Sequence, residues 1–270
     1  MGLIVETDLG RDPDDLFTLI WLIESGVNIL AITITPGDRD QVAVARFLNN
    51  YYKLDIPIGV SDVNRTKLSS GGVHYKLLDR YKFPKEAKHD GLGSDIIAAD
   101  YMSALDEVLI IGPCTNVARW IQDYNPRIDR ATMQGGFLPC SMEKFKGKES
   151  MPTFNLNGDR NAGTTFLSHS IPERRMVGKN VCHGIILKKN IFTSGLNKEL
   201  ASIYLNGHSE KKMHDPLAAV CHFHPKIGNW VRGKTIKQGG GWTTDLSRPE
   251  DFILEGVNES EFWKILNNRN

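Results

Sequence analysis

The chain has 270 residues, of which 40% are hydrophobic and 24% charged, as in ordinary globular proteins. Its 33 basic and 32 acidic side chains almost cancel, which argues against binding to nucleic acid or to an anionic membrane surface. No apolar stretch is long enough to cross a membrane, and no secretory leader pattern precedes the first apolar run. The four cysteines lack Cys-x-x-Cys spacing and fit reduced thiols better than disulfides or zinc. We therefore expect a cytoplasmic protein that acts on a small molecule.

Strand-like and helix-like segments alternate along the chain, a pattern typical of a parallel sheet covered by helices. We predict an α/β fold with a Rossmann-like, open, mostly parallel sheet and helices on both faces. Without a linker or an internal repeat, residues 1–270 are expected to form one domain. The predicted strands are Gly2–Val5, Asn28–Thr35, Ile56–Val60, Glu107–Ile111, Ala131–Gly136, Arg175–Val181, Ile227–Ile236 and Phe252–Val257. The predicted helices are Leu16–Leu22, Gln41–Leu54, Thr115–Asp123, Asp159–Ser168, two segments within residues 197–224 that are separated near Gly207, and one that begins at Glu259.

Two long segments interrupt this alternation. Residues 62–93 are rich in Ser, Gly, Lys and His and carry at most a short helix at Tyr75–Tyr81, and residues 138–158 are also irregular. Long loops in compact domains are often functional. We therefore predict that residues 62–93 form a mobile lid or a loop on the substrate side.

Four aspartates occupy one short turn after the first strand, in the run Asp8-Leu9-Gly10-Arg11-Asp12-Pro13-Asp14-Asp15. A single Asp here would be an ordinary helix cap. Four carboxylates at this density repel one another unless a positive charge holds them. Oxygen ligands are those that Ca²⁺ and Mg²⁺ prefer, so the turn predicts a site for a hard cation.

Other polar segments also follow predicted strands: Thr35–Asp38, Ile111–Pro113 and Gln134–Gly136. In a parallel sheet these segments meet the Asp-rich turn at one edge, where ligands bind. A further segment, Met213–Ala219, places Asp215 directly before a proline suited to the first helical position. Asp215 can therefore cap a helix, aim a carboxylate at the site, or do both. Beside it, His214 becomes a candidate proton donor.

Together these segments resemble the metal-dependent nucleoside hydrolases of the inosine-uridine preferring kind, which cleave the N-glycosidic bond of ribonucleosides. The resemblance extends in the family's order over nearly the whole chain. It is carried by Asp8–Asp15, by Gly112-Pro113-Cys114-Thr115-Asn116, by Gly135-Gly136, by Thr153-Phe154-Asn155 and by His214-Asp215-Pro216-Leu217-Ala218.

The resemblance implies a Ca²⁺ ion held by Asp8, Asp15, Asp215 and the backbone carbonyl of Ile111. It implies that Asp8 is also the general base that removes a proton from the metal's water, and that His214 lies near the leaving base. It further implies a nucleoside substrate and a homodimer or homotetramer. The residues that it assigns to substrate binding are Asp14 at the ribose 2′-hydroxyl, Asn155 at another ribose hydroxyl, and the positions of Asp38 and Thr153.

Three positions depart from the family pattern. Five residues separate Asp8 from Asp14 where the family has three, so Asp12 could supplement or replace a ligand. Asp38 stands in place of Asn, and Thr153 in place of a Glu that contacts the sugar. The lost carboxylate and the nearby basic residues Lys144, Lys146, Lys148 and Arg160 lead us to hypothesise a modified-base or 5′-phosphorylated nucleoside. The alternative is a solvated lysine loop.

Other interpretations remain open at this point. A Mg²⁺-dependent phosphohydrolase of the haloacid dehalogenase kind also carries Asp after its first strand, but it needs a second Asp two residues later, where this chain has Gly10. A non-catalytic nucleoside-binding or sugar-binding protein could share the fold. Trp242 is a candidate for stacking on a base, with core packing as the alternative.

Overall fold

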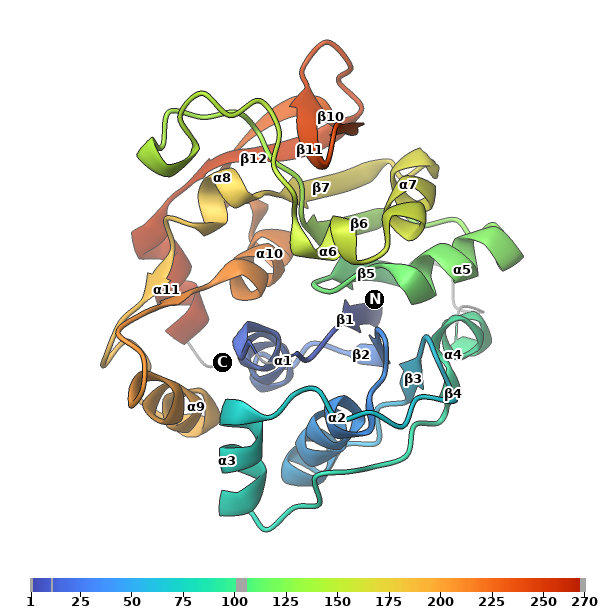
Figure 1. Ribbon diagram of the computed structural model, residues 1–270, viewed down its shortest axis with the longest axis vertical. Coiled ribbons are helices and arrows are strands. Elements are labelled where there is room, and N and C mark those ends of the chain that lie inside the picture. The colour runs from blue at the N-terminus through green and yellow to red at the C-terminus, as the bar shows by residue number, and fades with distance from the viewer. Residues whose placement is uncertain (1, 11, 101–105, 268–270) are drawn as a thin grey trace.

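A ten-stranded sheet forms the centre of the computed structural model, which describes residues 2–10, 12–100 and 106–267 (Figure 1). The strand order is β11-β10-β12-β7-β6-β5-β1-β2-β3-β4. Every pairing from β12 to β4 is parallel, whereas β10 pairs antiparallel with β12 and β11. The strands are β1 (Gly2–Thr7), β2 (Ile29–Ile34), β3 (Ile58–Val60), β4 (Gly91–Leu92), β5 (Asp106–Ile110), β6 (Arg130–Gln134), β7 (Glu173–Val177), β10 (Gly228–Gln238), β11 (Gly241–Asp245) and β12 (Asp251–Val257), with β8 (Ile186–Leu187) and β9 (Lys211–Lys212) forming a separate antiparallel pair.

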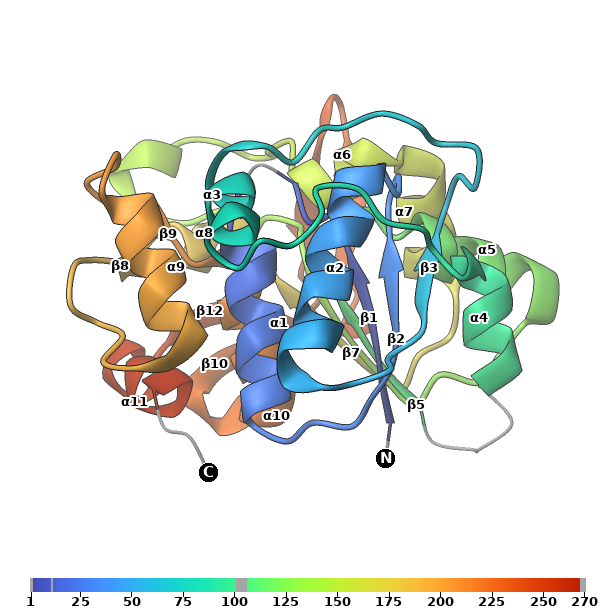
Figure 2. The ribbon, with the colours of Figure 1, turned by 90° about the horizontal axis from the view of Figure 1, so that it is seen from below.

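Helices cover both faces of the sheet, as predicted (Figures 1 and 2). The helices α1, α2, α3, α9, α10 and α11 contribute to one apolar core, and α4, α5 and α7 contribute to the other. The helices are α1 (Asp14–Glu24), α2 (Arg39–Tyr52), α3 (Gly72–Arg80), α4 (Gly93–Asp100), α5 (Thr115–Tyr124), α6 (Phe154–Gly158), α7 (Arg160–Ser168), α8 (Lys179–Cys182), α9 (Gly195–Leu205), α10 (His214–Phe223) and α11 (Glu259–Asn267), with short 3₁₀ turns η1 (Glu143–Phe145) and η2 (Pro225–Ile227).

The apolar side chains of β1 explain how one strand serves two cores. Leu3 and Val5 lie in the core shared with α1 and α10, whereas Ile4 lies in the core shared with α5 and α7. Successive residues of a strand point to opposite faces, so a strand is apolar at consecutive positions where it packs against a core on both sides, as Leu3, Ile4 and Val5 do. This requirement produces the uninterrupted apolar run that made β1 recognisable in the sequence.

The structure departs from the predicted elements mainly near the C-terminal edge of the sheet. The predicted strand Arg175–Val181 ends at Val177, because Gly178 leaves the strand and α8 begins at the next residue. The predicted elements did not include β4, β8, β9, β11, α4, α6 or α8. Trp242 was predicted as a candidate for base stacking. Trp242 is instead buried in β11, and its indole nitrogen donates to Asn157 Oδ1 (3.0 Å), so the core-packing alternative is correct.

The segment 62–93 contains α3, where a short helix was predicted at Tyr75–Tyr81, and the two-residue strand β4, which was not predicted. Its proposed mobility stays a prediction. Among the described residues, no helix has the length and apolar character that crossing a bilayer requires. Arg11 of the Asp-rich turn lies outside the described residues.

A glycine at the end of β5 determines how closely the site-bearing loops approach each other. A Cβ atom on Gly112 would lie 2.5 Å from the carbonyl carbon of Thr7 and 2.6 Å from the nitrogen of Asp8. Contacts this short exclude any side chain at residue 112. The glycine thus allows Ile111 to lie against the start of the Asp-rich turn.

Candidate active site

A cavity of about 860 Å³ lies at the carboxyl edge of the parallel strands. Its lining comes from the segments that follow β1, β2, β3, β5, β6 and β7, and from the first turns of α1, α2 and α10. Arg65 and Ser69 are the lining residues from the segment 62–93. This is the edge at which open α/β sheets bind ligands. The strand ends that the sequence predicted to converge do therefore share one cavity.

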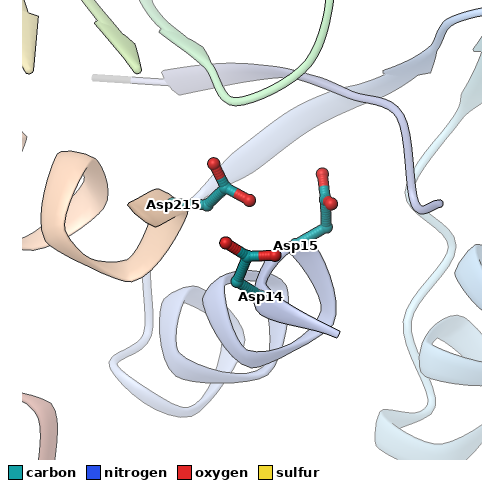
Figure 3. Close-up of side chains that lie close together, drawn as sticks. All are labelled: Asp14, Asp15 and Asp215. Carbon is teal, nitrogen blue, oxygen red and sulfur yellow. The ribbon is translucent and has the colours of Figure 1, made fainter. Parts of the chain in front are cut away.

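Three buried carboxylates meet in this cavity, and with Asp8 they form what we call the acidic cluster: Asp8, Asp14, Asp15 and Asp215. One oxygen from each of Asp14, Asp15 and Asp215 lies within 4.8 Å of the other two. Figure 3 shows Asp14 and Asp15 on the first turn of α1 and Asp215 on the first turn of α10, with their carboxylates facing one another. Two helix N-termini, which favour negative charge, thus point at one place.

The electrostatics of this trio are unfavourable without a cation. Burial, followed by the charge of Asp14, raises the pKa of Asp15 to about 7. Burial and the charges of Asp14, Asp15 and Asp8 raise the pKa of Asp215 well above its usual range. Within the described chain, neither Asp15 nor Asp215 has an ion-pair partner. Buried carboxylates without a counter-charge are the oxygen donors that a hard cation would satisfy, so this donor set fits a metal.

Asp8 lies beside the trio rather than within it. Its backbone nitrogen donates to Asp15 Oδ1 (3.3 Å), and the same oxygen accepts a hydrogen bond from the Thr7 hydroxyl (2.5 Å). Burial, then the charges of Asp15 and Asp14, raise the pKa of Asp8 well above its usual range. Two of the four predicted ligands, Asp15 and Asp215, therefore lie close together, and Asp14 lies with them. Asp8 lies next to this trio.

Sequence reasoning missed Lys211, a cation built into the acidic cluster. The Lys211 side chain is only 4% exposed, and its Nζ lies 2.8 Å from Asp12 Oδ1 and 3.2 Å from Asp14 Oδ2. Burial tends to raise the pKa of Asp14, but Lys211 and His214 outweigh it and hold that pKa below its usual range. Asp12, which the sequence offered as an extra ligand, is paired with this lysine instead. The only signal in the sequence was a Lys pair just before the His214-Asp215 motif.

His214 begins α10 and faces the same carboxylates. Its Nδ1 lies 3.5 Å from Asp14 Oδ2, and its Nε2 is buried without a hydrogen-bond partner among the described residues. A buried nitrogen of this kind usually has a partner in the working state of a protein. The Nε2 atom is therefore available to a ligand in the cavity.

The Ile111 carbonyl and Asn155 are joined in a second network. The Asn155 side-chain nitrogen lies 3.0 Å from the Ile111 oxygen, 3.0 Å from the Gln134 carbonyl oxygen and 2.9 Å from Gln134 Oε1. One amide group has only two hydrogens for these three acceptors, and a carbonyl oxygen has two lone pairs. The Ile111 carbonyl thus keeps capacity for another partner, and Asn155 fixes its position.

The two remaining predicted substrate-binding residues differ in their surroundings: Asp38 has side-chain partners, whereas the buried Thr153 hydroxyl has no hydrogen-bond partner among the described residues. Asp38 lines the cavity, caps α2 together with Gln41, and forms an ion pair with Arg65. Thr153 is 2% exposed, precedes α6 and does not line the cavity, so the structure does not bring it to the site. Gln41, which sequence reasoning also missed, donates from its side chain to the Asp8 carbonyl.

A second charged group borders the cavity, which we call the basic cluster: Lys144, Lys179 and His183. Lys179 and His183 line the cavity, and the His183 ring centroid lies 5.3 Å from that of His214. Lys144 Nζ lies 3.2 Å from His183 Nδ1, and Lys179 Nζ donates to the Pro152 carbonyl (2.6 Å). Burial, then the positive charges of His214, Lys144, Lys212 and Lys179, lower the pKa of His183 to about 3.

Comparison with known proteins gives consistent matches. The family model described as inosine-uridine preferring nucleoside hydrolase matches residues 3–264. An uncharacterized protein of Aquifex aeolicus (strain VF5) is 22% identical over 241 residues, covering 81% of each chain. The solved structure of a plant nucleoside hydrolase has a TM-score of 0.79 at 17% identity and covers 99% of this chain and 98% of that one. A purine-preferring ribonucleoside hydrolase from Gardnerella vaginalis has a TM-score of 0.74 at 15% identity and covers 100% and 98%. At these identities the solved structures establish the fold.

Proposed function

Because the chain belongs to the family of inosine-uridine preferring nucleoside hydrolases, and is thus an N-glycosyl hydrolase, we propose that it hydrolyses a ribonucleoside to free base and ribose. The reaction takes place at the acidic cluster and depends on Ca²⁺. The observation that carries this proposal is the convergence of three buried carboxylates at the sheet edge.

The proposed ligands of the cation are Asp15, Asp215, Asp8 and the backbone carbonyl of Ile111. All four offer oxygen, the donor that calcium prefers, and all four line the cavity. A bound calcium ion would act as a Lewis acid that lowers the pKa of water. The raised pKa values of Asp8, Asp15 and Asp215 support this assignment, because a cation lowers them again.

In the proposed reaction, one side chain acts on each side of the N-glycosidic bond. An oxygen of the Asp8 carboxylate accepts a proton from the attacking water, whose oxygen forms a bond to C1′ of the ribose. The bond between C1′ and the base nitrogen breaks, and the leaving base takes a proton from His214 Nε2. Positive charge develops on the sugar as this bond lengthens, and the surrounding carboxylates stabilise it.

The proposed sugar contacts are made by residues that surround this centre. Asp14 accepts a hydrogen bond from the ribose 2′-hydroxyl, since Lys211 keeps its carboxylate ionised. Asn155 and Asp38 contact the other ribose hydroxyls from their positions in the cavity lining. We leave Thr153 out of this set because it is buried away from the cavity.

A panel of purine and pyrimidine nucleosides tests the proposed function, with release of reducing sugar as the measurement. We expect sugar release in calcium buffer, its loss with chelator and its return when calcium is added back. A nucleoside-binding protein without activity would release nothing, and a phosphohydrolase would release inorganic phosphate from nucleotides. Sugar release that is indifferent to chelator would contradict the proposed metal dependence.

We also propose that residues 1–270 act as one domain within a homodimer or homotetramer, as the family resemblance implies. Light scattering of the purified protein tests the assembly, and a monomer would contradict it. The cytoplasmic location stays a prediction.

A further inference from the structure

The cations around the cavity differ in whether they are neutralised. Arg65 is paired with Asp38, and Lys211 is paired with Asp12 and Asp14. In the basic cluster, Lys144 contacts a histidine ring and Lys179 contacts a backbone carbonyl. Within the part of the chain that the structure describes, neither lysine has a carboxylate oxygen in ion-pair range. The basic cluster is therefore the part of the cavity wall with uncompensated positive charge.

The half-buried position of Lys179 makes this lack of a partner significant. An exposed lysine is hydrated by water, but burial removes part of that hydration and is costly without a counter-charge. Burial and the nearby charge of Lys144 lower the pKa of Lys179. The pKa of His183 is lowered as well, because burial and the neighbouring positive charges disfavour the protonated form of its ring. An anion at this place would offset the positive charges of Lys144 and Lys179.

The location of Lys179 connects the basic cluster to the proposed sugar site. Its Nζ donates to the carbonyl of Pro152, two residues before the first residue of α6, and α6 carries Asn155. On the other side, His183 contacts His214, the proposed proton donor to the leaving base. An anion held here would be a substituent of a ribonucleoside bound at the acidic cluster, and a cavity of about 860 Å³ has the size of pockets that enclose such ligands.

We propose that the substrate is a ribonucleoside with an anionic substituent, bound by the Lys179 ammonium in the cavity wall and supported by the charge of Lys144, which contacts His183. This inference rests on the proposed function and specifies its substrate class. The same chemistry has two sources, a phosphate ester on the sugar and a carboxylate on the base. Lysine binds either anion as a point charge, and its contribution is larger where water is partly excluded.

The sequence suggested four basic residues as candidates for binding a phosphate, and the structure supports a different set. Lys146 and Lys148 are exposed and do not line the cavity, and Arg160 donates to the Gly240 carbonyl. Of the four basic residues that the sequence offered, only Lys144 lies in the basic cluster. Lys179 was not singled out at all.

The test compares kcat/KM for three substrates: uridine, uridine 5′-monophosphate and orotidine, whose base carries a carboxylate. We expect at least a tenfold preference for one of the two anionic substrates over uridine, with most of the difference in KM. In Lys179→Met this preference should fall about tenfold. Lys148→Met is the matched control, because that lysine is exposed and lies outside the cavity, and its preference should equal that of the unmodified protein.

The possible outcomes separate this inference from the proposed function. Equal kcat/KM for all three substrates overturns the anionic substituent and leaves the nucleoside hydrolase proposal in place. No sugar release from any nucleoside or nucleotide overturns both. An anion preference that survives in Lys179→Met overturns the assignment of the basic cluster. Calorimetry with ribose and ribose 5-phosphate provides a readout independent of turnover: tighter binding of the phosphate, weakened in Lys179→Met but not in Lys148→Met, supports the phosphate source.

Discussion

The acidic and basic clusters share one cavity but manage their charge differently. The acidic cluster is partly compensated from within the protein, by Lys211 at Asp14 and by two helix N-termini. The basic cluster has no carboxylate partner for its lysines in the described chain, and burial together with neighbouring positive charges lowers the pKa of its histidine. From this difference we infer that the cavity binds two ligands of opposite charge: the proposed cation at the acidic cluster and the proposed anionic group at the basic cluster.

The largest expected effect comes from the acidic cluster. Asp8→Asn removes the proposed proton acceptor, and a positioned general base typically contributes about 10²–10⁴-fold in rate. We expect kcat for sugar release to fall by this factor while the thermal unfolding curve stays cooperative. The matched control is Asp123→Asn, an exposed aspartate on α5. A folded Asp8→Asn protein with undiminished turnover would remove Asp8 from the mechanism.

Removing the internal cation of the acidic cluster is expected to affect stability. Lys211→Met leaves the buried Asp14 carboxylate without its ammonium partner, and breaking a buried ion pair in this way costs about 3 kcal/mol. Urea unfolding without calcium measures the difference. Lys212→Met is the control, because the Lys212 side chain is more exposed than that of Lys211 and its ammonium lies 3.9 Å from Glu210 rather than beside a buried carboxylate. An unchanged unfolding free energy in Lys211→Met would show that the pair is not stabilising.

The stability of the acidic cluster should depend on pH, and calcium should change that dependence. The pKa of Asp15 is raised from 3.8 to about 7 in the folded chain, and those of Asp8 and Asp215 are raised too. The folded state therefore holds more protons than the unfolded state between these values, so the metal-free protein loses stability as pH rises through this window. Calcium needs the ionised carboxylates and should offset this loss.

We expect calcium at 100 times its Kd to stabilise the protein by about 2.7 kcal/mol at pH 8 and by much less at pH 5. Thermal unfolding with calcium or chelator at both pH values measures this. Equal stabilisation at the two pH values would contradict calcium binding by these carboxylates.

The smallest expected effect lies in the basic cluster. Lys144 is exposed and reaches the cavity only through His183, so it should contribute as an exposed ion pair does, about 0.2–1 kcal/mol. Lys144→Met should therefore lower the preference for an anionic substrate by at most about fivefold, less than Lys179→Met. Kinetics at two salt concentrations measure this contribution, which screening should weaken further. A larger loss than in Lys179→Met would reverse the assigned order of the two lysines.

The fold could be predicted because its signals are local. Consecutive residues are enough to indicate an apolar strand such as β1 and the polar turn that follows it. The convergence of the carboxyl ends of these strands then follows from parallel pairing. The predicted open, mostly parallel sheet with helices on both faces is confirmed. The antiparallel β11 was missed because its burial depends on contacts with α6 and α7, which the sequence does not display.

The candidate site was predicted less completely, because charge pairing depends on distant packing. Asp14, Asp15 and Asp215 stood in recognisable motifs, and the structure brings their oxygens together. Nothing in the sequence around Lys211 or Lys179 shows that the first is paired with Asp14 or that the second borders a cavity. Their neighbours come from elements far away in the chain, and only the fold reveals them.

The ion pairs that Lys211 forms with the turn after β1 have a consequence for the proposed calcium site. Because a buried ammonium already pairs with Asp12 and Asp14, we expect the chain to close this turn without bound calcium. The proposed calcium then binds to a preformed site, so its removal should abolish activity without unfolding the protein. We therefore expect the calcium-free protein to remain folded and to gain activity when calcium is added.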